Sequence, residues 1–356
     1  MGSNLRTLRA VLSRNGPGRY PLHLAVILTA AVLRWPFSSY ERWWVLRSHL
    51  SPKNPTEPPP IFIVGHWRSG TTFLYNLLSR SPQFAYVSPI ATGLPWDFLT
   101  MGKLLRPLLE KGLPEGRFID QVPVNSDSPQ EDEIALASMQ PVSFYHGLYF
   151  PKNFIQNFNA GIFFDHCSHQ DIQGWRWAMV HFCQKLQLQN PGRQLLIKNP
   201  VHTAQIAQLR SLWPNAKFIH IYRNPYVVFQ STLNFYAKLF QELALQRFDQ
   251  VPIRESILKS YPKMMQALCK DTQDLPKQDF IEIQFEAFEA DPMADLQRIY
   301  TQLELDRWEQ AKPVFQSYLD AQKRYQKNRY AFPADVIEQV QAHWQPFIDR
   351  WGYGPP

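Results

Sequence analysis

The residues best suited to chemistry in this chain lie in one short polar loop, from Gly65 to Thr72. The loop contains two glycines, and its one cation is Arg68. Its hydroxyl groups belong to Ser69, Thr71 and Thr72. Backbone N–H groups in such a loop, together with those that open a following helix, point at one spot and favour a bound anion. The loop is therefore predicted to hold a phosphate through its amides and hydroxyls, while Arg68 reaches the group beyond it.

A buried strand and a helix are expected to position this loop. Residues 61–64 form an unbroken apolar run, which is typical of a strand buried on both faces of a parallel sheet. From Thr72 onward the apolar residues recur at helical spacing. They are Phe73, Leu74, Leu77 and Leu78. Strand, glycine-bearing loop and helix together form the local architecture of an anion-binding site.

The two glycines, Gly65 and Gly70, have the spacing of a nucleotide-binding P-loop, but the residues after Gly70 differ. An NTPase needs a Lys there for the terminal phosphates and a hydroxyl for Mg²⁺. Thr71 and Thr72 occupy these positions, so the loop residues require no metal. A P-loop kinase or NTPase is therefore the disfavoured alternative. An ordinary strand–helix turn is the structural alternative.

The segment resembles the phosphosulfate-binding loop of the sulfotransferase superfamily. In that family the loop grips the 5′-phosphosulfate of PAPS (3′-phosphoadenosine 5′-phosphosulfate). The resemblance implies that the chain binds PAPS as co-substrate, without a metal. It also implies that the nucleotide-binding residues of this loop are Arg68, Ser69, Gly70, Thr71 and Thr72.

A second segment matches the same family. Residues 218–222 read as a strand, Arg223 ends it, and Pro225 opens a helix that carries Ser231 eight residues after the arginine. An Arg and a Ser placed in this way can converge on one phosphate. The spacing is that of the family's 3′-phosphate motif, which implies that Arg223 and Ser231 bind the 3′-phosphate of PAPS. The resemblance spans roughly residues 60–330.

Three acids lie in the segment from Ser128 to Ile134, which reads Ser-Pro-Gln-Glu-Asp-Glu-Ile. They could simply favour a helix start, with Asp127 or Ser128 as N-cap and Pro129 in the first turn. Sulfuryl transfer to a hydroxyl, however, needs a group that takes the hydroxyl proton. Membrane-associated and bacterial relatives show a similar segment, which implies that Glu131, and after it Glu133, is the base.

Three further sites are expected to contribute. Lys198 ends the short apolar strand 195–197, and the resemblance implies that it neutralises charge on the transferred group. His66, inside the loop, is the rival base. The late basic segment 322–330 resembles one that closes over the nucleotide in many sulfotransferases. It makes Lys327 and Arg329 candidate nucleotide contacts, whereas a solvated helix end is the structural alternative.

The basic charge of the chain is concentrated in its first 50 residues. The net charge is +7, and residues 1–50 hold seven arginines and one acid, which gives +6. Because the rest is nearly balanced, a nucleic-acid binder is disfavoured. The three widely spaced cysteines form no disulfide framework or metal cluster and indicate a reducing, cytoplasmic compartment.

The N-terminal arm, residues 1–50, is expected to be helical. It combines the apolar run 24–33 with arginines and tryptophans, which suits a helix lying at an anionic membrane surface. The uninterrupted run is too short to span a bilayer. A helical hairpin packed on the catalytic domain is the other hypothesis. The proline-rich segment 51–60 reads as a linker to the first strand.

The sequence thus predicts an α/β fold: a P-loop-type, mostly parallel sheet with helices on both faces over residues 61–356, preceded by the arm. The expected reaction is in-line sulfuryl transfer from PAPS to an acceptor hydroxyl. The aromatic stretch 140–190 and the arm favour a lipidic or apolar alcohol as acceptor. A non-catalytic membrane adaptor on the same fold is the remaining alternative.

Overall fold

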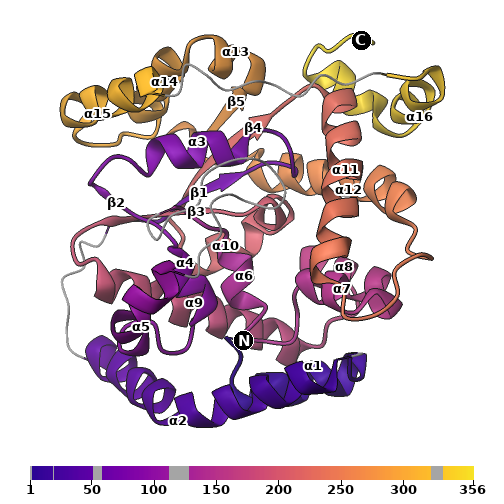
Figure 1. Ribbon diagram of the computed structural model, residues 1–356. Coiled ribbons are helices and arrows are strands. Elements are labelled where there is room, and N and C mark those ends of the chain that lie inside the picture. The colour runs from indigo at the N-terminus through magenta and orange to yellow at the C-terminus, as the bar shows by residue number, and fades with distance from the viewer. Residues whose placement is uncertain (1, 19, 51–57, 112–127, 322–331) are drawn as a thin grey trace. The chain divides into compact units, whose positions relative to one another are not determined.

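The computed structural model describes residues 2–18, 20–50, 58–111, 128–321 and 332–356, which form two compact units (Figure 1). The first, here called the helical unit, comprises Met1–Pro58, Ala85–Leu195 and Lys238–Val251. The second, the sheet unit, comprises Pro59–Phe84, Leu196–Ala237 and Pro252–Pro356. The predicted arm, residues 1–50, falls within the helical unit.

Five strands form the sheet, in the order β2-β3-β1-β4-β5. They are β1 (Ile61–Val64), β2 (Phe84–Ala85), β3 (Gln194–Lys198), β4 (Lys217–Tyr222) and β5 (Phe280–Gln284). β1 pairs in parallel with β3 and with β4, and β4 pairs in parallel with β5. Every residue of β1 is buried, which explains its unbroken apolar run. The predicted mostly parallel α/β sheet is confirmed.

The parallel register gathers the candidate site residues at one edge of the sheet. Ile63 of β1 is level with Lys198, the last residue of β3, and Val64 is level with His220 of β4. Gly65 and Arg223 follow directly after β1 and β4. The carboxyl ends of parallel strands form the usual ligand-binding edge of an open α/β sheet.

Helices cover both faces of this sheet (Figure 1). α3 (Thr71–Leu78) packs on β1, and α14 (Pro292–Gln302) lies on the same side. α10 (Ile206–Leu212) and α12 (Ile253–Thr272) pack on each other on the opposite side. The remaining helices that lie in this unit, wholly or in part, are α11 (Pro225–Leu243), α13 (Phe285–Ala290), α15 (Trp308–Ala321) and α16 (Ala334–Arg350).

The described part of the helical unit consists of helices and loops, apart from a few end residues of β2 and β3. Its helices beyond the arm are α4 (Pro89–Gly93), α5 (Met101–Lys111), α6 (Asp132–Leu136), α7 (Tyr145–Tyr149), α8 (Phe154–Phe163) and α9 (His169–Gln189). The Ser88 hydroxyl caps α4 by accepting the Ala91 N–H, a start signal that a five-residue helix barely shows in sequence.

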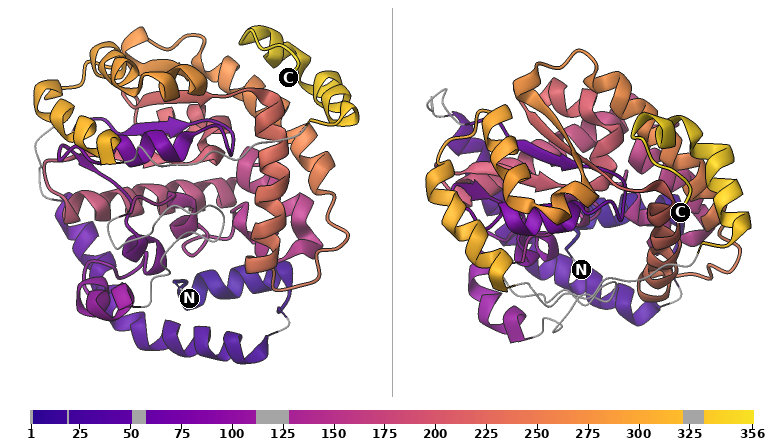
Figure 2. Two further views of the ribbon diagram at one scale, coloured as in Figure 1. Left: turned by 45° about the horizontal axis from the view of Figure 1, so that its top comes forward. Right: turned by 90° about the horizontal axis from the view of Figure 1, so that it is seen from above.

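The N-terminal arm is helical, as expected. It consists of α1 (Leu5–Asn15) and α2 (Pro21–Leu50), and α2 runs along the outside of the helical unit (Figure 2). Although the apolar run alone looked too short for a span, the helix extends well beyond it. The stretch Pro21–Ser48 is long and apolar enough to cross a membrane by length and composition alone.

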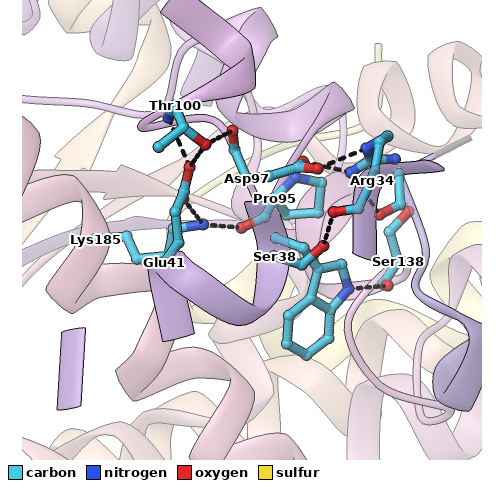
Figure 3. Close-up of polar contacts among 10 residues, drawn as sticks. Arg34, Ser38, Glu41, Pro95, Asp97, Thr100, Ser138 and Lys185 are labelled. Atoms are coloured by element: carbon cyan, nitrogen blue, oxygen red, sulfur yellow. Dashed lines mark hydrogen bonds and ion pairs between the residues drawn. The ribbon is translucent and has the colours of Figure 1, made fainter. Parts of the chain in front are cut away.

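Two buried ion pairs fasten α2 to the rest of its unit (Figure 3). The Arg34 guanidinium donates to both carboxylate oxygens of Asp97, at 2.5 and 2.7 Å. Glu41 lies 2.7 Å from Lys185 Nζ on α9, and both side chains are fully buried. Glu41 also accepts the backbone N–H and the hydroxyl of Thr100, each at 2.6 Å. The arm therefore packs on other parts of the helical unit.

Candidate active site

The loop after β1 is pressed closely against its neighbours. Gly65 has a φ of 144°, and a Cβ there would lie 2.4 Å from the Ile221 carbonyl oxygen. Its N–H donates to the Thr203 hydroxyl at 2.8 Å. A side chain at this position would therefore push the loop off β4. Thr203, 138 residues away in sequence, is a supporting residue that sequence reasoning missed, because a single sequence carries no signal for such a contact.

The far end of the loop turns through two residues with left-handed backbone conformations. Arg68 has a φ of 69° and Gly70 a φ of 96°, and Gly70 is the N-cap of α3. The Phe285 ring lies so close to Gly70 that no Cβ fits between them. Gly70 leads directly into the first turn of α3, where free N–H groups and the helix dipole favour an anion.

The two predicted phosphate motifs meet at Arg68. Its Nε donates to the Ser231 hydroxyl at 2.8 Å, although the two residues are 163 positions apart. Arg223 Nη1 donates to the Arg68 backbone carbonyl at 3.3 Å. Two guanidinium groups and a hydroxyl thus lie around one stretch of loop backbone. Arg223 and Ser231, which the sequence predicts to bind one phosphate, therefore both contact Arg68 of the loop.

An aromatic ring supports this cluster. The Arg223 guanidinium carbon lies 4.3 Å from the centroid of the Phe285 ring, the same ring that packs on Gly70. A cation over an aromatic face at this distance is attracted to it. Phe285 follows β5 directly, so it stands at the same sheet edge as the other site residues. Its position directly after a strand could have identified Phe285 as a site residue from the sequence, but this prediction was not made.

Lys198 adds a third cation at the start of α3. Its side chain is only 2% exposed, and Nζ lies 3.4 Å from the Thr72 hydroxyl in the first turn of that helix. Asn199 caps the following 3-10 turn, Pro200–Ala204, by accepting the Val201 N–H. The structure thus brings Arg68, Lys198 and Arg223 together with the hydroxyls of Thr72 and Ser231.

The rival base His66 is packed in an aromatic cluster. Its ring is 2% exposed and lies 5.1 Å from the Tyr261 ring and 6.4 Å from the Trp344 ring, centroid to centroid. Its Nδ1 is 3.0 Å from the Trp67 carbonyl oxygen. Burial lowers the pKa of His66 to about 4, so the imidazole is neutral at pH 7. This packing gives His66 a structural role in the sheet unit.

The candidate carboxylates belong to the helical unit. Glu131 is the N-cap residue of α6, is half-buried, and makes no side-chain bond to the amides of the helix. Glu133 is 1% exposed and accepts the Ser143 hydroxyl at 2.6 Å. The expectation that Ser128 caps this helix, with Pro129 in its first turn, is wrong. The Gln130 N–H donates to the Val87 carbonyl, which keeps the chain extended until Glu131.

A small cavity of about 190 Å³ is lined by Ser143, the partner of Glu133, and by Arg14 and Asn15 of α1. The N-terminal arm and the hydroxyl that bonds Glu133 therefore border the same cavity. Lys327 and Arg329, the late basic candidates, lie outside the described residues.

Sequence comparison identifies the family of the chain. Residues 59–310 match the profile of a family described as "Sulfotransferase family". The chain is also 29% identical over 295 residues to the omega-hydroxy-beta-dihydromenaquinone-9 sulfotransferases Stf3 of Mycobacterium bovis and Mycobacterium tuberculosis. That similarity covers 83% of this chain and 75% of each relative.

Structural comparison finds the same fold. The chain is similar to the sulfotransferase STF9 from Mycobacterium avium, with a TM-score of 0.68 and 16% identity over 88% of this chain and 82% of that one. It is also similar to STF1 from Mycobacterium tuberculosis, with a TM-score of 0.59 and 16% identity over 87% and 81% of the two chains. Because the matched family profile spans more than two thirds of its length, the chain belongs to the sulfotransferase family, and its reaction is the transfer of a sulfuryl group to a hydroxyl acceptor.

Proposed function

We propose that this sulfotransferase takes the sulfuryl group from PAPS and places it on the hydroxyl of a lipidic alcohol. The observation that carries the choice of donor is the bond between Arg68 and Ser231, which joins the two phosphate motifs into one site. PAPS presents a 5′-phosphosulfate and a 3′-phosphate. A site for it therefore needs two neighbouring anion-binding regions, and the sheet unit offers both.

The donor fits the residues around α3. The amides and hydroxyls of Ser69 to Thr72 would hold the 5′-phosphosulfate, because Gly70 is the N-cap of α3 and a helix N-terminus favours an anion. Arg223 and Ser231 would hold the 3′-phosphate through a charged fork and a hydroxyl. Lys327 and Arg329 are proposed as further contacts to the nucleotide.

The reaction we propose is an in-line displacement at sulfur. The acceptor oxygen forms the new S–O bond while the bond from sulfur to the 5′-phosphate oxygen breaks. Its electron pair leaves on adenosine 3′,5′-bisphosphate. Arg68 and Lys198 would stabilise the negative charge on the transferring and departing oxygens, since fixed cations in a dry site act strongly on developing charge.

The acceptor proton needs a base, and Glu131 is our proposal for it. Glu131 is half-buried at the N-cap position of α6, whereas Glu133 is buried and accepts the Ser143 hydroxyl. Burial, and after it the charge of Glu133, raises the pKa of Tyr149 to about 12, so Glu133 also faces a buried phenol. These contacts suit Glu133 to organising the segment, and it remains the second candidate base.

The acceptor class follows from the comparison and from the arm. The Stf3 relatives are named for a hydroxylated dihydromenaquinone, which is a lipid alcohol. The helical unit of this chain carries many buried aromatic side chains and the exposed apolar helix α2. A lipid acceptor is dissolved in a membrane, so we also propose that residues 1–50 contact a membrane and that the enzyme works at its cytoplasmic side.

Calorimetric titration with adenosine 3′,5′-bisphosphate in the presence of a chelator tests the donor. We expect binding without any divalent metal, because the proposed contacts are amides, hydroxyls and cations. Binding that appears only with Mg²⁺ would instead favour a P-loop kinase or NTPase.

A further inference from the structure

Helix α2 has two very different sides. Its buried and half-buried positions, among the residues described, recur at helical spacing, which places them in a stripe along one side of the helix. They are Leu24, Ile27, Ala30, Ala31, Arg34, Ser38, Glu41, Trp44, Val45 and Ser48. The ion pairs of Arg34 and Glu41 lie within this stripe, so the stripe faces the protein. Most of the circumference of the helix therefore faces outward.

The outward side of α2 is apolar along most of its length. Its large apolar side chains, here called the outer face, are Leu22, Val26, Leu28, Val32, Leu33, Trp35, Phe37, Tyr40, Trp43 and Leu46. Leu22 is 80% exposed, Leu33 69% and Trp35 65%. Soluble monomers rarely expose a contiguous apolar patch of this extent, and larger ones mark an interaction site.

The exposed charges in the described part of α1 and α2 are all positive. Arg42 and Arg47 are exposed near the C-terminal end of α2, and Arg47 lies over the Trp43 ring at 5.3 Å. Arg6 and Arg9 are exposed on α1. The one acid of residues 1–50, Glu41, is turned inward and paired. Cations together with Trp and Tyr side chains are typical of segments that lie at the interface of an anionic membrane.

We propose that α2 is an in-plane membrane anchor. Its outer face lies at the boundary between headgroups and acyl chains of a bilayer that contains anionic lipid, and its inner stripe stays fastened to the helical unit. This inference specifies the membrane contact proposed for residues 1–50, and it rests on that proposal. A spanning helix is the competing mode, but it would have to release Arg34 and Glu41 from Asp97 and Lys185, both of which are buried.

The anchor is connected to the candidate base segment within the same unit. The Thr7 hydroxyl of α1 donates to the Met139 carbonyl at 3.0 Å, just beyond α6. The Trp96 indole N–H, next to Asp97, donates to the Ser138 carbonyl at 3.0 Å (Figure 3). A membrane held on the outer face of α2 would therefore lie close to the part of the protein that we propose receives the acceptor hydroxyl.

Flotation of the full-length protein with lipid vesicles tests the anchor. We expect binding to phosphatidylcholine vesicles that contain phosphatidylglycerol, and weaker binding without it or at high salt. The double variant Leu33→Ser/Trp35→Ser should bind about tenfold more weakly or worse, because each side chain loses its burial in lipid. The matched control, Ile155→Ser/Val314→Ser, removes two exposed apolar residues elsewhere and should bind as wild type does.

A depth measurement separates an in-plane helix from a spanning one. An environment-sensitive dye is attached to a cysteine placed at Leu22, Leu33 or Leu46, with Cys167 and Cys269 changed to serine. An in-plane helix predicts similar depths for all three dyes, as reported by lipid-borne quenchers. A deep dye at Leu33 with shallow dyes at both ends would show a span and overturn the proposal.

Two other results would also overturn it. One is an absence of vesicle binding by the wild type. The other is a dimer that Leu33→Ser/Trp35→Ser dissociates, which would make the outer face an interface between copies of this chain. Transfer from PAPS to a short water-soluble alcohol, measured without vesicles, reports on catalysis separately. If the wild type does not transfer the sulfuryl group to this alcohol, the proposed function is wrong. If it does so but does not float with vesicles, only the anchor is wrong.

Discussion

Replacing Lys185 by methionine should destabilise the protein in a way that depends on pH. Methionine is similar in length but removes the cation that faces Glu41, whose carboxylate is fully buried 2.7 Å from Lys185 Nζ. It also removes the donor to the Pro95 carbonyl. A buried carboxylate without its partner either stays charged at great cost or takes up a proton. The smaller of these two free-energy costs determines how much stability the variant loses.

The proton route gives the magnitude. A glutamate titrates at about 4.3 when unfolded, so protonating Glu41 in the fold at pH 7 costs about 2.7 pH units, or about 4 kcal/mol. At pH 6 the same step costs about 2 kcal/mol. Because the folded variant then binds one more proton than its unfolded chain, its stability falls as pH rises. Breaking a buried pair costs about 3–5 kcal/mol in other proteins, which agrees with the estimate at pH 7.

Urea unfolding of wild type and Lys185→Met at pH 6 and pH 7 measures both numbers. The double variant Glu41→Gln/Lys185→Met should recover most of the loss, since a neutral amide keeps an oxygen for Thr100 and leaves no charge behind. Lys259→Met, which breaks the exposed pair with Glu255, should leave stability unchanged at both pH values. A loss below about 1 kcal/mol would show that Glu41 reaches water and does not fasten α2. A larger loss that is equal at both pH values would show that Glu41 stays charged and would refute the proton route.

Three further predictions concern the sheet unit and the base. Arg223→Ala should weaken the binding of adenosine 3′,5′-bisphosphate by about 1.5–3 kcal/mol and leave the binding of adenosine 5′-phosphate nearly unchanged, as measured by calorimetry. Equal losses of affinity for both ligands would show that Arg223 has a structural role. Glu131→Gln should lower turnover by about 10²–10⁴ with PAPS binding kept, and if Glu133→Gln alone is inactive, the base is misassigned. The lowered pKa of His66 should cost the wild type about 3 kcal/mol as pH falls from 6.5 to 4, because only the unfolded chain takes up that proton. In unfolding measurements His66→Gln should flatten this slope, and the exposed His343→Gln should not.

The sheet and the donor site could be predicted because their signals are local. The four apolar residues of β1, the glycines after it and the eight-residue step from Arg223 to Ser231 each lie within one short segment. Parallel strands then bring their carboxyl ends to one edge, so residues that end strands meet without further information. Lys198 and Arg223 were found in this way, and Phe285 could have been.

The supporting contacts could not be predicted, because each one joins distant parts of the chain. The Thr203 hydroxyl that accepts the Gly65 N–H leaves no local pattern. Ser128 looks like a helix cap in sequence, yet the backbone bond from Gln130 to Val87 moves the start of α6 to Asp132. Tertiary hydrogen bonds of this kind override local preference.

The two sides of the N-terminal arm could not be predicted from its sequence either. Its composition fitted both a packed hairpin and a membrane helix. In the structure one side of α2 is packed through buried ion pairs, and its other side exposes apolar residues. The inward turn of Arg34 and Glu41 depends on Asp97 and Lys185, which are far away in sequence. These buried pairs also mean that deleting residues 1–50 would leave charges without partners, so point changes on the outer face are the sounder test.

The most direct test of the account is to incubate the protein with sulfur-labelled PAPS and a cell lipid extract in the presence of a chelator. We predict that the label appears in a lipid-soluble sulfate ester and that Lys198→Ala abolishes its formation. Adenosine 3′,5′-bisphosphate should accumulate in equal amount. Label that remains on PAPS, or that moves only to water-soluble acceptors, would contradict the proposal of sulfuryl transfer to a lipidic alcohol.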